Sequence, residues 1–275
     1  MINDFLSMMT PEFIRNFILP ALIGGIAVTL CSSLLGVSLV LKRYSMIGDG
    51  LSHVGYGALS IAAVMNLAPL KFALPVVIVA AIILLRMNDN GKLKGDSAIA
   101  IFSTTALAIG ILVSDKAGLK NEVSEYMFGS LLAMDGSDVL LSVVLSVAVL
   151  LMFIIFYNKI FAVTFDENFS RASGVRVNVY KMLIAVLTAI TVVLGMMMMG
   201  ALLISSLIVF PAISSMRIFR SFRAVMISSA IVSVLCFLIG FFISLILDIA
   251  PGSSVVVVNA AVFLIFSAIG FLRKN

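Results

Sequence analysis

The sequence predicts an all-α integral membrane protein with about eight or nine transmembrane helices. Of its 275 residues, 62% are hydrophobic and only 11% are charged, whereas soluble domains have roughly 45–50% apolar and about 25% charged residues. Apolar windows of about 20 residues, the length that crosses the hydrocarbon core of a bilayer, recur along nearly the whole chain. They leave no room for a soluble domain, so residues 1–275 are expected to form a single transmembrane domain.

In chain order, the predicted spans are 17–41, 47–65, 68–86, 97–114, 138–157, 182–200, 201–216, 224–247 and 254–272. The stretch 182–216 contains no charged residue. At about 1.5 Å per residue it is too long for one helical crossing and short for two. The segment from Gly195 to Gly200 is the natural place for a turn. The second part of this stretch is therefore a full span or a short re-entrant helix.

The distribution of basic residues predicts the orientation, because Lys and Arg accumulate on the cytoplasmic side. If the N-terminus is external, most of the 18 basic residues lie inside. The exceptions are Arg15, Lys71, Lys116 and Lys120. The chain must return to the cytoplasm before Arg217, since a single crossing would place the basic residues 217–223 outside. We therefore expect an external N-terminus and a cytoplasmic C-terminus.

Two connecting segments are longer than simple turns. Residues 115–136 fall on the external side and carry Asp115, Glu122, Glu125 and Asp135. Residues 158–180 fall on the cytoplasmic side and mix both signs of charge. This second segment is predicted to form a short amphipathic helix that ends near Gly174.

Ionisable side chains inside a span are costly and point to function. Asp49 and His53, the only histidine in the chain, open the second predicted span. They are four residues apart, so both project from one helix face. A carboxylate and an imidazole can bind one divalent cation such as zinc or manganese, although two ligands do not close a site. They can equally form a hydrogen-bonded pair within the bundle, with Ser52 beside them to orient either group.

Glycines surround this pair, at Gly48, Gly50, Gly55 and Gly57. Small residues let helices approach closely in a membrane. We therefore expect these four positions to serve helix packing rather than ligand binding.

Other candidate residues favour structural roles. Met196 to Met199 offer soft thioether ligands, but consecutive residues on a helix point in different directions, so core packing is expected. Asp248 is interpreted as a solvated residue at an external helix end. Cys31 and Cys236 lie in apolar stretches, which excludes a disulfide framework.

Several functional classes lack their sequence signatures. No G-x-x-x-x-G-K-[ST] loop for nucleotides and no G-x-S-x-G element for serine chemistry occurs. Gly48-Asp49 lacks the first glycine of the intramembrane aspartyl protease motif. The basic residues are spread over short loops, so no nucleic-acid partner is expected.

Four stretches resemble the permease subunits of zinc, manganese or iron uptake ABC transporters of the ABC-3 type. Residues 42–53 (KRYSMIGDGLSH) are similar to the family's basic residues and GDALSH-like segment, with Gly50 in place of alanine. Residues 166–175 are similar to its cytoplasmic D-x-x-x-A-x-x-x-G-V element, with Ser170 in place of alanine. Residues 200–212 and 126–132 are similar to its G-x-L-L…P-A and Y-L-F-G-S-L-L stretches. The likeness runs through the whole chain in order.

This resemblance implies an ABC importer permease fold in the bacterial plasma membrane. It implies a homodimer, two ATP-hydrolysing partner subunits on the cytoplasmic face, and an extracytoplasmic binding protein that delivers the metal. The chain itself would be a transport subunit, with no covalently bound cofactor and ATP bound only by the partner. Asp49 and His53 would lie on the translocation path. The coupling helix would span residues 166–175, including Asp166, Glu167, Ala172, Gly174 and Val175.

Two other classes of function stay open at this point. A cation-coupled secondary carrier or a channel would need no ATPase. A multi-spanning membrane enzyme would need a catalytic constellation, which the sequence does not contain.

Overall fold

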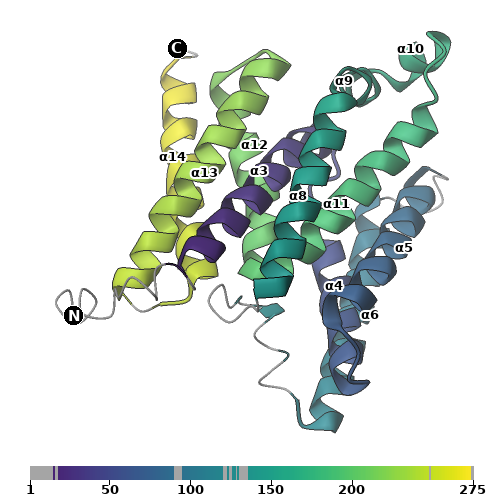
Figure 1. Cartoon of the computed structure of the whole chain (residues 1–275). Coiled ribbons are helices and arrows are strands. Elements are labelled where there is room, and N and C mark those ends of the chain that lie inside the picture. The colour runs from purple at the N-terminus through teal and green to yellow at the C-terminus, as the bar shows by residue number, and fades with distance from the viewer. Residues whose placement is uncertain are drawn as a thin grey trace.

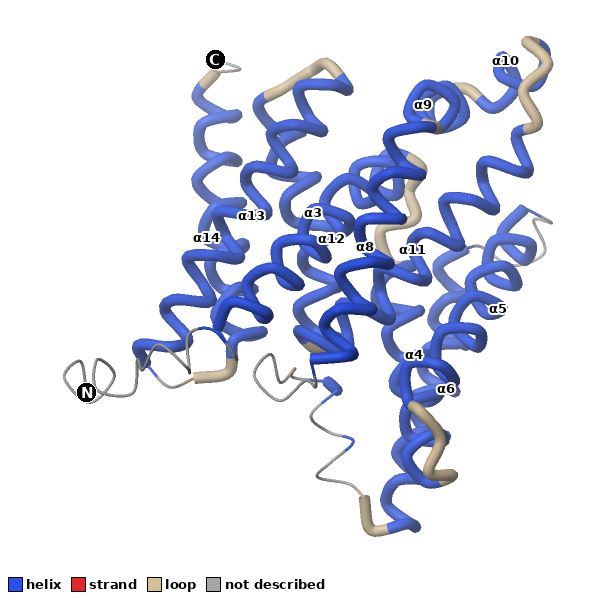
Figure 2. Tube along the Cα trace, in the orientation of Figure 1, coloured by secondary structure: helices blue, strands red, loops and turns tan. Residues whose placement is uncertain are grey.

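The computed structural model describes residues 15, 18–89, 95–119, 123, 126–127, 129, 136–247 and 249–273. This part of the chain is almost entirely helical and contains no strand (Figures 1 and 2). The long helices are α3 (Leu19–Leu41), α4 (Ile47–Val64), α5 (Pro69–Asp89), α6 (Gly95–Ala117), α8 (Gly136–Ile155), α11 (Val177–Met199), α12 (Ala201–Ile218), α13 (Phe222–Leu247) and α14 (Pro251–Leu272). Two short helices, α9 (Tyr157–Phe165) and α10 (Glu167–Ala172), lie between α8 and α11.

The long helices occupy the predicted spans. Within the described residues, seven of them are long and apolar enough to cross a membrane, and eight are if α8 and α9, bent by 68°, form one broken span. If the bent pair counts as one span, the described residues contain eight candidate spans, the lower of the two predicted numbers of transmembrane helices. The helix α4 covers the predicted span 47–65 but is not among those seven, because Asp49, His53 and its glycines lower its hydropathy.

A sharp turn at Gly200 separates α11 from α12. Gly200 has a φ of +88°, a conformation that glycine adopts at little steric cost. The expected break between residues 195 and 200 is therefore confirmed at its last residue. The methionine run just before it packs in the core, since Met196, Met198 and Met199 are completely buried.

The predicted amphipathic helix in 158–180 is two helices rather than one. Asp166 has an extended backbone, with φ −147° and ψ 102°, and interrupts the helix between α9 and α10. The next helix, α11, begins at Val177, five residues before the start of the predicted span 182–200. The predicted short helix ending near Gly174 is present as α10, but the additional helix α9 was not predicted. The two are separate because Asp166 caps α10 rather than continuing α9.

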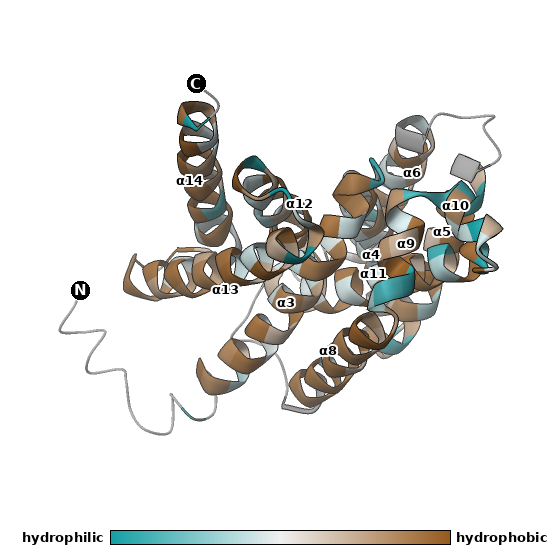
Figure 3. Ribbon diagram, turned by 90° about the horizontal axis from the view of Figure 1, so that it is seen from above, coloured by the Kyte–Doolittle hydropathy of each residue, from teal (hydrophilic) through white to brown (hydrophobic). Residues whose placement is uncertain are grey.

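The helix ends gather at two levels (Figure 1). The helix α10, the turn between α12 and α13, and the last turn of α14 lie at one end of the bundle, while α3 begins at the other. Seen from the α10 end, α14 and α10 stand on opposite sides of the molecule (Figure 3). The cytoplasmic location of this end remains a prediction from the basic residues.

The core lies along α3 and α11, whose side chains are mostly buried, whereas α14 is mostly exposed. The exposed side chains of α14 are large and apolar, for example Leu264 and Ile265. Such a surface suits lipid rather than water. The helix α4 packs between α5 and α6 and also contacts α11 and α12, so it is held on several sides by the bundle.

Candidate metal site and coupling segment

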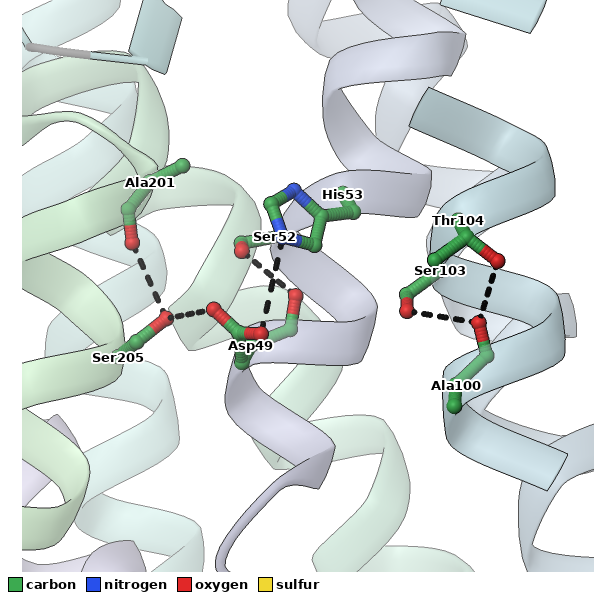
Figure 4. A network of polar contacts seen from close by, with 8 residues as sticks. All are labelled: Asp49, Ser52, His53, Ala100, Ser103, Thr104, Ala201 and Ser205. Carbon is green, nitrogen blue, oxygen red and sulfur yellow. Dashed lines mark hydrogen bonds and ion pairs between the residues drawn. The ribbon is translucent and has the colours of Figure 1, made fainter. Parts of the chain in front are cut away.

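Asp49 and His53 lie one turn apart near the start of α4 and point toward each other (Figure 4). The distance from His53 Nε2 to Asp49 Oδ2 is 3.6 Å. The Asp49 side chain is 48% exposed and that of His53 is 22% exposed. We call these two residues the α4 site. The 3.6 Å separation is too long for a strong hydrogen bond, and both side chains keep part of their surface exposed.

Serine side chains surround the α4 site from two helices. Ser205 of α12 lies with its Oγ 3.3 Å from Asp49 Oδ1 and 3.1 Å from the carbonyl of Ala201. Ser52 donates instead to the backbone carbonyl of Asp49, at 2.7 Å. The sequence suggested Ser52 as the orienting residue. The structure places Ser205 beside the carboxylate, and only the fold brings this residue to α4.

The donor set of the α4 site is small. Among the described residues, no group of three or more His, Cys, Asp or Glu side chains is placed to hold a metal ion. His53 Nδ1 is buried and has no hydrogen-bond partner. Ordered metal sites usually have four or more ligands, so this chain alone offers an incomplete coordination shell. Two ligands can bind a passing divalent cation weakly.

The glycines of α4 lie where neighbouring helices come close. A Cβ built on Gly57 would lie 2.6 Å from the carbonyl oxygen of Ala106 in α6. Cβ atoms on the other three would meet side chains, namely those of Ile208 at Gly48, Ile99 at Gly50 and Met196 at Gly55. Side chains can yield, but the backbone of α6 cannot, so Gly57 is the position where any larger residue forces the helices apart.

Residues 166–175, which we call the coupling segment, form one tightly capped helical turn and its exit. The Asp166 side chain accepts a hydrogen bond from Phe169 N–H at 2.9 Å and caps α10. At the other end, Gly174 has a φ of +80°. The N–H groups of Gly174 and Val175 donate to the carbonyls of Arg171 and Ser170. These two bonds form a Schellman cap just after Ala172, the last residue of α10.

An ion-pair cluster fastens the coupling segment to the bundle. Glu167 pairs with Lys42 Nζ at 2.6 Å and with Lys181 Nζ at 3.3 Å. Burial alone would raise the pKa of Glu167, but the hydrogen bond and charge of Lys42, together with those of Lys181, outweigh it and lower this pKa. Lys42 caps the end of α3 and Lys181 lies in α11. Three separate elements therefore meet at one carboxylate, an arrangement that the sequence did not reveal.

Two motifs from distant parts of the chain also meet. Gly129 lies against the backbone of Met199 and Gly200, which a Cβ on Gly129 would approach within 2.7 Å. Gly129 of the Tyr-x-Phe-Gly stretch thus touches the turn between α11 and α12. Both glycines have positive φ.

The fold and the site define a multi-pass, all-helical membrane protein with a pair of metal-type ligands in one of its helices. The profile of the ABC 3 transport family matches residues 14–270. The chain therefore belongs to the ABC 3 transport family. Its apolar helices and its bacterial relatives make it a multi-pass protein of the plasma membrane.

Similar proteins cover nearly the whole chain. The manganese import system permease protein ScaB of Streptococcus gordonii is 27% identical, over 94% of each chain. The high-affinity zinc uptake system membrane protein ZnuB of Haemophilus influenzae is 26% identical, over 91% of this chain and 96% of its own. The solved structure of PsaBC from Streptococcus pneumoniae in complex with Fab has a TM-score of 0.85 at 28% identity and covers 100% of both chains.

Proposed function

We propose that this chain is the membrane subunit of an ATP-driven importer that carries a divalent transition-metal ion, manganese or zinc, into the cytoplasm. The observation that carries the proposal is the α4 site. It places a carboxylate and an imidazole side by side and partly exposed on α4, a helix packed among the candidate membrane spans. Intramembrane ionisable residues of this kind mark ion pathways. The named relatives, which are manganese and zinc system permeases, support the same cargo.

The incomplete donor set supports a homodimer. Asp49 and His53 supply two ligands, and the described part of the chain adds no third His, Cys, Asp or Glu. A second copy that presents its own α4 site would bring the total to four, the usual number for zinc. Each ligand pair alone binds weakly, which favours release on the far side. Cargo must bind well enough to enter and weakly enough to leave.

ATP is bound and hydrolysed by a separate partner subunit that docks on the coupling segment. Phe169 and Arg171 are exposed on α10 and offer an apolar and a basic contact. Movement of α10 passes through Glu167 to Lys42, which ends α3 shortly before α4 begins at Ile47. This ion pair joins the proposed site of ATP-driven motion to the end of α3, just before the turn that leads into the helix with the metal ligands.

The test is metal uptake into liposomes that contain this permease and its ATPase, with the extracytoplasmic binding protein on the outside. We expect ATP-dependent accumulation of labelled manganese or zinc, and the preferred ion identifies the cargo. Uptake that proceeds equally without ATP would replace the proposal with a carrier or channel. Failure to move either ion, in vesicles where the ATPase is active, would contradict metal import.

A further inference from the structure

A basic cavity is lined by residues at the ends of α12, α13 and α14. The helix α14 stands on the opposite side of the molecule from α10 (Figure 3). It has a volume of about 750 Å³, within the range of roughly 300–1,000 Å³ that holds small ligands. Three arginines and two serines contribute its polar lining: Arg217, Arg220, Arg273, Ser221 and Ser267. Nothing in the proposed transport mechanism uses this cavity.

The arginines of the basic cavity have no acidic counterpart in the part of the chain that the structure describes. None of the lining residues is acidic, and in the described part of the chain no carboxylate pairs with Arg217, Arg220 or Arg273. After Glu167 the sequence contains a single acidic residue, Asp248, which directly follows the far end of α13. Three exposed guanidinium groups without a carboxylate partner around one cavity make it attractive to an external anion.

The surroundings of the basic cavity indicate which anion it takes. Phe219 and Phe271 also line it and are 39% and 68% exposed. Leu272, 74% exposed, follows Phe271 at the end of α14. Apolar side chains at helix ends suit acyl chains, while guanidinium groups bind phosphate in a forked geometry. A ligand that matches both features carries a phosphate and a hydrocarbon tail.

We propose that the basic cavity binds the phosphodiester headgroup of an anionic phospholipid, with the acyl chains along α14. Basic pockets between transmembrane helices bind such headgroups. Arg217 is partly held in place, because its guanidinium lies 6.0 Å from the ring centre of Phe263. The site therefore combines one positioned arginine with two others in its lining.

The experiment is native mass spectrometry of the permease in complex with its ATPase, released from nanodiscs of equimolar phosphatidylglycerol and phosphatidylcholine. The wild type is expected to retain phosphatidylglycerol selectively. The triple variant R217Q/R220Q/R273Q is expected to lose this preference by roughly one hundredfold, since each basic residue contributes about a factor of five. The matched control R43Q/R86Q/R176Q removes the same charge from exposed arginines outside the cavity and is expected to retain the lipid.

A second variant, S267F, fills the cavity and leaves all three arginines, so it should also lose the lipid if the cavity is the site. Equal retention by the wild type and both cavity variants would overturn the proposal, and so would equal loss in the control. If the spectra show inorganic phosphate bound to the wild type and no bound lipid, the cavity is a site for a free anion and the proposal is overturned. Lipid bound to the permease alone but absent from the ATPase complex would show that the partner covers the cavity, which also contradicts a lipid site in the assembled transporter.

Discussion

In the α4 site, Asp49 and His53 lie 3.6 Å apart and the carboxylate is about half exposed. In the coupling segment, Glu167 contacts two lysines at 2.6 and 3.3 Å, and both lysine side chains are only 7% exposed. The polar groups of the α4 site are available to bind a ligand, whereas the charged groups of the coupling segment are paired with one another inside the protein. The difference fits a weak cargo site in one region and a rigid mechanical attachment in the other.

The largest effect is expected from removing the ligands of the α4 site. Asp49→Asn and His53→Ala should each lower metal uptake by about 10–100-fold or more, the range that even an outer-shell partner of a metal costs. The melting temperature should change little, because the pair has only one long contact between its members. Uptake of labelled manganese and zinc, with membrane levels measured in parallel, checks both expectations.

The control for these two variants is Thr104→Val on the neighbouring helix α6. The Thr104 hydroxyl donates to the carbonyl of Ala100 at 2.7 Å and touches neither ligand (Figure 4). Wild-type uptake in His53→Ala at normal membrane levels would end the cargo role of the α4 site. Loss of folding in that variant would instead make the pair structural and break the contrast between the two regions.

The next effect concerns the exit from the coupling segment. Gly174→Ala forces a residue with a Cβ into the left-handed conformation, at a cost of about 1–2 kcal/mol, although open space surrounds the position. The strain should distort the Schellman cap and weaken binding of the ATPase subunit. Co-purification of the two subunits measures this loss.

Gly118→Ala provides a matched control, because Gly118 also has positive φ and open surroundings but lies beyond α6. It should strain the chain equally and leave ATPase binding unchanged. If both variants bind the ATPase equally well, the coupling segment is not the docking element.

A smaller effect is expected for Glu167→Gln. It should lower stability by about 1 kcal/mol, less than the 3–5 kcal/mol of a fully buried pair, because solvent screens the partly exposed carboxylate. The folded protein lowers the pKa of Glu167 below its ordinary value of 4.5. The stabilisation is therefore complete above that value and disappears as the pH falls through the lowered pKa.

Thermal unfolding of the wild type and Glu167→Gln between pH 7 and the acid range measures both features. The difference in melting temperature should narrow as the solution becomes acidic. Asn168→Ala, at the exposed neighbouring position, should show no such dependence. If the difference in melting temperature between the wild type and Glu167→Gln stays the same in acid, the ion pairs of Glu167 are not what stabilises the coupling segment.

The smallest effect should come from Ser205→Ala, which removes one hydroxyl beside Asp49. The loss of one hydrogen bond is worth about 0.5–1.5 kcal/mol, or roughly 2–10-fold in uptake. Ser206→Ala is the matched control, since the next hydroxyl along α12 donates to the carbonyl of Leu203. Equal uptake in both variants would show that Ser205 does not position the carboxylate.

The sequence predicted the parts of this protein that depend on local pattern. Apolar windows located the helices, and the spacing of Asp49 and His53 placed them on one face of α4. Gly200 marked the turn between α11 and α12. Each of these features follows from residues that are close in the chain.

Features that depend on distant residues were beyond the sequence. Ser205 reaches Asp49 from another helix, and Lys42 and Lys181 meet at Glu167 from α3 and α11. Polar contacts between residues far apart in the chain leave no repeating pattern in the sequence from which they could be predicted. The break at Asp166 was missed for a different reason, because a capping residue inside a polar stretch looks like any other charged residue.

The low hydropathy of α4 has a consequence for how the protein enters the membrane. An aspartate is costly to insert, up to about 2.5–3.5 kcal/mol at the centre of a helix, and α4 carries one with a histidine and four glycines. It is thus the long helix least suited to partition into lipid during synthesis. We expect its insertion to be supported by α5 and α6, which follow it in the chain and pack against it. The helix proposed to handle the cargo therefore resides in the membrane because its neighbours keep it there.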